Sequence, residues 1–208
     1  MTSAYHEGSR KLQERFDTKR LADRLEEKFL TGEPVIDDRS RAFIESVDMF
    51  FIATADAEGR PNCSYKGGDP GFVRVLDDQT IAFPNYDGNG MYLTTGNLDV
   101  NPHVGLLFIS FEKRTRLRLN GIASQSEDDG LMAEYSDAQF ITRVQATQVF
   151  PNCPRYIHHL ELVERSRFVP HAQCETPAPA WKQEDWAVDV LPEGDLALEP
   201  DVEVIHKG

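Results

Sequence analysis

Short apolar runs recur at close, even spacing through the middle of the chain, with polar or turn residues between them. β-Branched and aromatic residues are frequent in these runs, which is typical of strands. Asp56 to Gly59 has the composition of a hairpin turn. We expect strands at residues 49–55, 62–68, 72–76, 80–85, 104–110 and 116–124, and a late strand at 143–151. This order predicts a mainly β (α+β) barrel or sandwich and not a βαβ fold.

The start of the chain has apolar residues at the spacing of a helix. Between residues 9 and 30, apolar residues stand at mostly helical spacing among charged ones: Leu12, Phe16, Leu21, Leu25 and Phe29. The pattern predicts an amphipathic segment broken near Asp17, where Thr18 caps a second helix, and we expect it to pack on the barrel. Shorter helices are expected at 37–45, near 90–97 and at 131–141.

Three regions follow from this reading. Residues 1–45 form an N-terminal helical segment, 46–168 the barrel domain, and 169–208 an acidic, Pro-rich extension. The extension lacks the apolar periodicity of an independent core, which favours disorder. Trp181 and Trp186 favour the opposite interpretation, in which part of it docks on the body or on a second subunit.

Composition narrows the classes of function. The chain has 208 residues, 40% of them hydrophobic, and a net charge of −13. Such a surface repels polyanions, which argues against nucleic acid or an anionic membrane as a partner. No apolar run is long enough to span a bilayer, and the charged N-terminus is unlike a signal peptide, so we expect a cytoplasmic protein. Cys63, Cys153 and Cys174 show neither disulfide nor zinc spacing.

The ordered motifs from residue 61 onward resemble the pyridoxamine 5'-phosphate oxidase-like family of FMN-binding split barrels. Four elements carry the resemblance: PNCSYKGG at 61–68, FPNY at 83–86, NPHVGLLF at 101–108 and RLRLNG at 116–121. The resemblance covers roughly residues 40–160. It implies a split β-barrel with flanking helices and a homodimer that binds FMN between its subunits.

Carried over by position, the resemblance implies a set of cofactor-binding residues on the second and fourth strands, the following loop and a later strand. In this chain they are Cys63, Ser64, Lys66, Phe83, Pro84, Asn85, Asn89, Arg116, Arg118 and Arg155. Lys66 corresponds to a lysine that contacts the phosphate or the ring. Phe83 also fits a plain core position. Arg116 and Arg118 share a strand face by the period of two.

One departure from the family concerns the phosphate. Oxidases of the family have a basic pair after the corner, whereas this chain reads Tyr86-Asp87-Gly88-Asn89-Gly90. Phosphate binding then depends on Lys66, on Arg116 or Arg118, and on backbone amides of the Gly-rich turn. Arg155, between Pro154 and Tyr156, is a further candidate clamp for the phosphate or for an acidic substrate.

The sequence identifies no catalytic acid, base or nucleophile, and it predicts no metal site, because His158 and His159 face opposite ways on an extended chain. Cys153 is either a reactive thiol or an inert one. Chemistry would therefore come from the flavin acting on a small-molecule substrate or electron donor. We expect an FMN-dependent oxidoreductase. The alternatives are a flavin- or haem-binding storage or sensor protein without turnover, and an F420-dependent reductase.

Overall fold

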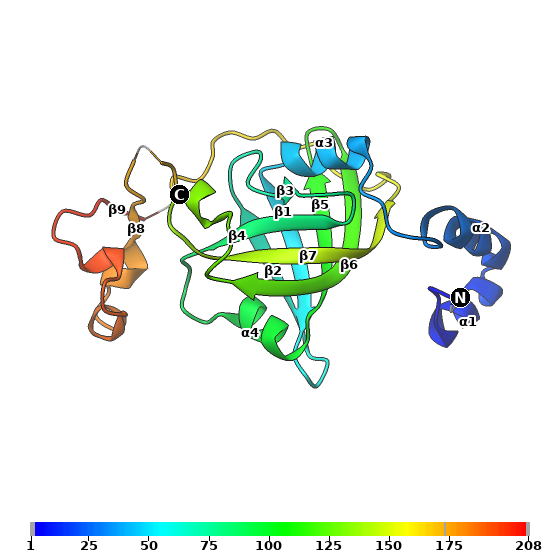
Figure 1. The fold of residues 1–208 in the computed structure, drawn as a ribbon, viewed down its shortest axis with the longest axis horizontal. Helices are drawn as coiled ribbons and strands as arrows, with labels where there is room; N and C mark the ends of the chain where they lie inside the picture. The colour runs from blue at the N-terminus through cyan, green and yellow to red at the C-terminus, as the bar shows by residue number, and fades with distance from the viewer. Residues whose placement is uncertain (1–2, 173, 207–208) are drawn as a thin grey trace.

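Seven antiparallel strands form one curled sheet at the centre of the molecule (Figure 1). The computed structural model describes residues 3–172 and 174–206. The sheet order is β2-β1-β5-β6-β7-β4-β3. Its strands are β1 (Met49–Ala55), β2 (Pro61–Gly67), β3 (Arg74–Val75), β4 (Thr80–Tyr86), β5 (His103–Ser110), β6 (Thr115–Ser126) and β7 (Ala138–Pro151). The split barrel expected from the resemblance is confirmed, and the seven expected strands are all present.

Phenylalanine rings fill the inside of the sheet. Phe50 is fully buried and lies against Phe72, Phe83 and Phe108, with ring centroids 5.0–5.8 Å apart. Strand register explains this gathering, because Phe50 pairs with Phe108, and Phe108 pairs with Leu117. Paired residues project to the same face of a sheet, so one row of apolar side chains crosses the three strands β1, β5 and β6.

Two short helices cover parts of the barrel. α3 (Asp38–Ser46) begins where the Asp37 side chain accepts a hydrogen bond from the Ser40 amide at 2.8 Å, and it packs beside β3. α4 (Leu93–Val100) packs on β1, β2 and β6. Both helices confirm the sequence prediction, although α4 begins three residues later than expected.

The prediction of a helix at 131–141 is wrong. Only the 3-10 turn η1 (Met132–Glu134) forms, and β7 begins at Ala138. Phe140 and Ile141 pair with β4 and β6 on either side, and Tyr135 donates a hydrogen bond from its hydroxyl to the Phe72 carbonyl at 3.0 Å. Pairing with two strands distant in sequence outweighs the local helical spacing. The strand expected at 72–76 is likewise reduced to Arg74–Val75.

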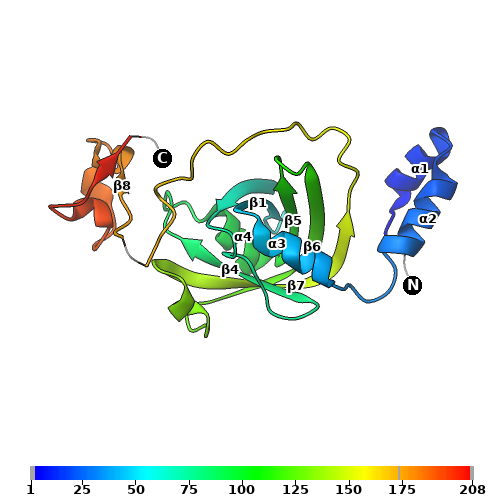
Figure 2. The ribbon, with the colours of Figure 1, turned by 90° about the horizontal axis from the view of Figure 1, so that it is seen from above.

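The two ends of the chain form small units on opposite sides of the barrel (Figures 1 and 2). The N-terminal hairpin consists of α1 (Glu7–Arg15) and α2 (Lys19–Phe29), which meet at Asp17, a residue with a φ of 51°. The predicted break is therefore confirmed. In the structure this hairpin stands beside the barrel, whereas α3 lies on it.

The C-terminal unit, residues 174–206, contains short strands and 3-10 turns. Strands β8 (Ala178–Pro179) and β9 (Val204–Ile205) pair in parallel around the 3-10 turns η2 (Ala180–Gln183), η3 (Val188–Val190) and η4 (Leu196–Leu198). Trp181 and Trp186 stack with centroids 5.7 Å apart. Across the described ranges 3–172 and 174–206, no helix combines the length and the apolar character needed to cross a membrane.

Candidate functional site

The two ends of the curled sheet approach each other at Lys66 and Asn85. Lys66 stands on β2 and Asn85 on β4, strands that lie five places apart in the sheet order. The Lys66 amine nevertheless lies 3.5 Å from the Asn85 side-chain oxygen, at the long end of the hydrogen-bond range. Two of the predicted site residues are therefore brought together across the split of the barrel.

Register explains why Lys66 lies at the split. Lys66 pairs with the fully buried Phe50, and Ser64 pairs with the fully buried Ile52, so both polar side chains project to the inner face of the sheet. Burial lowers the pKa of Lys66 below the ordinary lysine value. In the described part of the chain no carboxylate pairs with this amine. A desolvated, unpaired amine gains more from a bound anion than an exposed one does.

Further polar groups adjoin this pair. The Ser64 hydroxyl lies 2.8 Å from the Thr94 hydroxyl of α4. Asn85 is 7% exposed, and its side-chain amide donates to the Gln139 side-chain oxygen at 2.9 Å. Gln139 in turn donates to the Tyr92 hydroxyl at 3.1 Å. The split thus carries a lysine amine, three hydroxyls and two amides from β2, β4, β7 and the start of α4, a donor and acceptor set suited to a polar, anionic ligand.

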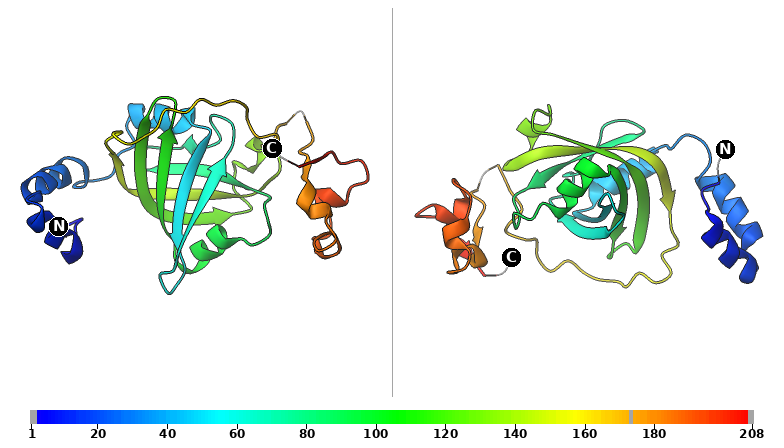
Figure 3. Two further views of the ribbon diagram at one scale, coloured as in Figure 1. Left: turned by 180° about the vertical axis from the view of Figure 1, so that it is seen from behind. Right: turned by 90° about the horizontal axis from the view of Figure 1, so that it is seen from below.

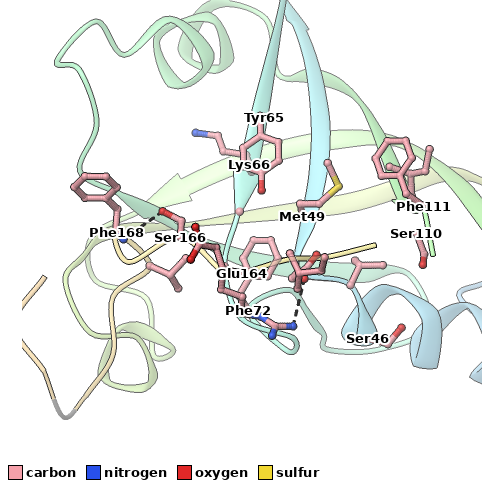
Figure 4. A pocket seen from close by; sticks show the side chains of 18 of the residues that line it. Ser46, Met49, Tyr65, Lys66, Phe72, Ser110, Phe111, Glu164, Ser166 and Phe168 are labelled. Carbon is pink, nitrogen blue, oxygen red and sulfur yellow. Dashed lines mark hydrogen bonds and ion pairs between the residues drawn. The ribbon is translucent and has the colours of Figure 1, made fainter. Parts of the chain in front are cut away.

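A cavity of ≈ 980 Å³ opens beside Lys66. Its floor includes Met49, Tyr65 and Phe111 of the barrel, and residues 160–169 line its other side. Figure 4 shows these side chains, with the amine of Lys66 directed away from Phe111. A volume of this order matches pockets that hold cofactors or drug-sized molecules.

The cover of this cavity is the segment 152–169, which we call the covering segment. It leaves β7 and runs around one side of the barrel toward the C-terminal unit (Figures 2 and 3). Arg165 holds it to the barrel, donating to the Asp48 carboxylate at 3.3 Å, and the Leu162 amide donates to Glu112 at 3.3 Å. These few exposed contacts hold the segment loosely, since surface ion pairs contribute little.

The predicted arginines lie on the other face of the sheet. Arg116 and Arg118 flank Leu117, which shares the row of Phe50 and Phe108, so both project outward. Their common face agrees with the prediction. Arg116 donates to the Cys153 carbonyl at 2.7 Å, a bond that fixes the start of the covering segment. Within one chain, neither arginine joins Lys66, and Arg155 is an exposed residue of the covering segment.

The remaining predicted residues are dispersed. Pro84 lines the cavity with Lys66. Phe83 is 3% exposed, and its ring belongs to the core. Cys63 pairs with Ala53, which places it on the outer face, where it is an exposed free thiol. Asn89 accepts a hydrogen bond from the Met91 amide at 3.1 Å, so it shapes the turn that precedes α4.

The loop after β4 is contacted by a lysine of the C-terminal unit. Lys182 of the C-terminal unit is 4% exposed and donates to Asp87 at 2.6 Å and to Asp195 at 2.7 Å. Burial by itself would lower the pKa of Lys182, but the bonds to the two carboxylates outweigh it and raise that pKa. Lys182 thus places a cation beside the loop that lacks the basic pair, but this cation is already paired with the carboxylates of Asp87 and Asp195.

Sequence reasoning missed Gln139, Thr94, Lys182 and the cavity-lining part of the covering segment, residues 160–169. The helix predicted at 131–141 concealed Gln139, which is the second residue of strand β7 and lies beside Asn85. No local signal singles out Thr94 or Lys182, because their partners Ser64 and Asp87 are 30 and 95 residues away. Among the described residues, no three His, Cys, Asp or Glu side chains gather as a metal site requires.

Several solved structures are similar to part of this chain. A putative pyridoxamine 5'-phosphate oxidase from Lactobacillus delbrueckii is 21% identical with a TM-score of 0.46, over 56% of this chain and 93% of its own. HutZ, a heme storage protein from Vibrio cholerae, is 22% identical with a TM-score of 0.42, over 56% and 94%. An FMN-binding protein from Syntrophomonas wolfei is 11% identical with a TM-score of 0.45, over 67% and 96%. These likenesses carry no functional conclusion for this chain.

No curated protein matches the chain. The family model described as pyridoxamine 5'-phosphate oxidase matches residues 36–153. The matched range begins just before α3 and ends at Cys153, so it contains the whole barrel, Lys66, Asn85 and the outer-face arginines. Because the match spans more than half of the 208 residues, the chain belongs to the pyridoxamine 5'-phosphate oxidase family.

Proposed function

We propose that this protein is an FMN-dependent oxidoreductase that binds its flavin between the two barrels of a homodimer. The observation that carries the proposal is the Lys66 amine, which is largely removed from water in the split and, among the residues that the structure describes, is hydrogen-bonded only to the neutral side chain of Asn85. An amine in that state is poised for an anionic ligand. Family membership makes a flavin the leading ligand.

The residues at the split fit the polar parts of FMN. Lys66 supplies a positive charge for the phosphate or for the oxygen-rich edge of the ring, while the hydroxyls of Ser64 and Thr94 and the amide of Asn85 match ribityl hydroxyls and ring edges. The flavin, when bound, supplies hydride or electron transfer. The protein's part is to bind, to orient, and to restrict water by means of the covering segment.

The homodimer enters the proposal because the arginines lie on the outer face. Arg116 and Arg118 cannot reach the split of their own barrel, but an outer face packed against a second barrel would present them to the partner's site. The phosphate would then have a cation from each chain. The missing basic pair of the β4–α4 loop makes this second cation necessary.

The visible spectrum of the purified protein tests the ligand. Bound flavin gives a yellow protein whose absorption is bleached by a reduced nicotinamide donor, whereas haem gives an intense Soret band. No histidine lines the cavity among the described residues, which is why we place haem second. Mass spectrometry of the extracted ligand distinguishes FMN from F420. A colourless protein that stays colourless after incubation with FMN would contradict the proposal.

Affinity measurements test the site. Lys66→Ala removes a charge-assisted hydrogen bond worth about 1.5–3 kcal/mol, so FMN affinity should fall about tenfold to a hundredfold. Lys66→Arg keeps the charge and is the matched control. We expect Lys66→Ala combined with Arg116→Ala to leave a folded dimer that retains no flavin. Full retention of flavin by this folded double variant would show that the phosphate lies elsewhere.

A further inference from the structure

The N-terminal hairpin exposes a repeated pairing of one basic and one apolar residue. Within each helix the pairs recur four residues apart, so they line one face. The four pairs are Lys11-Leu12, Arg15-Phe16, Arg20-Leu21 and Arg24-Leu25. Leu12, Phe16 and Leu21 are 54%, 66% and 61% exposed. Large apolar side chains that are exposed together in a small helical unit indicate a contact surface.

Two basic residues of the hairpin, Arg10 and Lys19, are paired with acids of α2. Arg10 binds Asp23 and Glu26 and thereby joins α1 to α2. Lys19 also binds Asp23. Lys11, Arg15 and Arg20 have no ion pair among the residues that the structure describes. Three cations are therefore left beside the apolar stripe, available to a partner.

The C-terminal unit presents the complementary surface. Residues 174–206 contain nine carboxylates and a single lysine, Lys182, which is buried. Exposed apolar side chains stand next to exposed acids: Trp186 follows Asp185, and Val190 follows Asp189. Trp186 and Val190 are 66% and 74% exposed. Acid and apolar residues thus alternate here as basic and apolar residues do on the hairpin.

The two surfaces of one chain cannot meet. The hairpin and the C-terminal unit lie on opposite sides of the barrel in every view (Figures 1, 2 and 3). The linker before α3 is held to the barrel, since the Ile36 amide donates to the Asp78 carbonyl at 2.7 Å. The complementary surface must come from another molecule, and a second copy of the chain supplies it.

We propose that the N-terminal hairpin of one protomer docks on the C-terminal unit of a second copy, in a two-fold dimer whose barrels lie antiparallel. A two-fold axis across the long direction of the molecule sets each hairpin beside the partner's C-terminal unit and forms two identical contacts. The apolar stripes cover each other, and Lys11, Arg15 and Arg20 face the acids around Asp185 and Asp189. The contact is independent of flavin binding.

Carbodiimide cross-linking tests where the hairpin docks. The reagent joins a lysine amine directly to a carboxylate, and a mixture of ¹⁵N-labelled and unlabelled full-length protein separates contacts between chains from contacts within one. We expect cross-linked peptides that join residues 7–30 to residues 184–199 and carry one heavy and one light partner. Pairs with both partners of the same isotope only, or no pairs joining these ranges, would overturn the proposal.

A charge exchange tests the complementarity. Lys11→Glu with Arg15→Glu makes the hairpin repel the partner's acidic unit, and Asp185→Lys with Asp189→Lys makes the reverse change. Amide exchange across residues 19–29 should become about tenfold faster in each variant alone, because each rim charge contributes modestly. Mixing the two variants makes both contacts of the heterodimer complementary, so protection should return.

Arg39→Glu, an exposed charge reversal on α3, is the control and should leave exchange in the hairpin unchanged. If amide exchange in the hairpin were as fast in the mixture as in the separate variants, the hairpin would not dock on the C-terminal unit of a second copy. Protection that does not weaken with added salt would also contradict the proposal, since the contact is partly electrostatic.

Discussion

The barrel and the two terminal units are stabilised in different ways. Inside the barrel, Phe50 and its aromatic neighbours are fully or almost fully buried. The terminal units are small and place most of their large apolar side chains in solvent, so they depend on charged contacts such as Arg10 with Glu26 and Lys182 with Asp195. Burial of apolar surface scales with domain size, and units of about 30 residues cannot exclude enough water by themselves.

Truncating the core aromatic should have the largest effect. Phe50→Ala leaves a cavity among the three remaining aromatic rings, and we expect a loss of about 3–5 kcal/mol in the free energy of unfolding of the barrel. Urea denaturation followed by circular dichroism measures it. The exposed Tyr65→Ala on β2 is the control, and an equal loss in both variants would contradict a core centred on Phe50.

Removing the buried lysine should come next and should act on one unit. Lys182→Met leaves Asp195 buried without its partner, and breaking such a pair costs about 3 kcal/mol or more within the structure that contains it. We expect faster amide exchange in residues 174–206 and at the loop around Asp87, with an unchanged barrel. Lys182→Arg keeps the charge and should lose less. If the barrel unfolded first, the division into separate units would be wrong.

The pH dependence of stability tests whether the Lys66 amine is removed from water. Its pKa is lowered in the folded protein, so between that lowered pKa and the ordinary lysine value the unfolded chain binds more protons. The free energy of unfolding should therefore rise with pH across this alkaline window, and the contribution should vanish in Lys66→Met. Parallel curves for the two proteins from neutral to alkaline pH would contradict the burial of the amine.

Breaking the ion pairs of the N-terminal hairpin should have the smallest effect on the whole molecule. Arg10→Ala removes the contacts that join α1 to α2, so amide exchange in residues 7–29 should become faster while the melting temperature of the barrel stays unchanged. Lys28→Ala on α2, whose cation lies over the Phe29 ring, is the matched control within the same hairpin. A lower melting temperature for Arg10→Ala would show that the hairpin supports the barrel.

Local pattern was sufficient for most elements of the fold. The run at 49–55 and the break at Asp17 were predicted where they occur, because each depends on neighbours in sequence. Phe140 and Ile141 were misread, because their partners are strands β4 and β6. The site shows the same division: Lys66 and Asn85 were identified one by one, but Gln139 and Lys182 became visible only through contacts across 54 and 95 residues.

The sequence by itself determined a seven-stranded barrel of this family and the candidates Lys66 and Asn85, because strand alternation and turn chemistry act over a few residues. The tertiary structure decided which cations share a space. It placed Lys66 in the split, turned Arg116 and Arg118 to the opposite face, and brought Lys182 to Asp87. The curl of the sheet sets these distances, and curl is a property of all strands together.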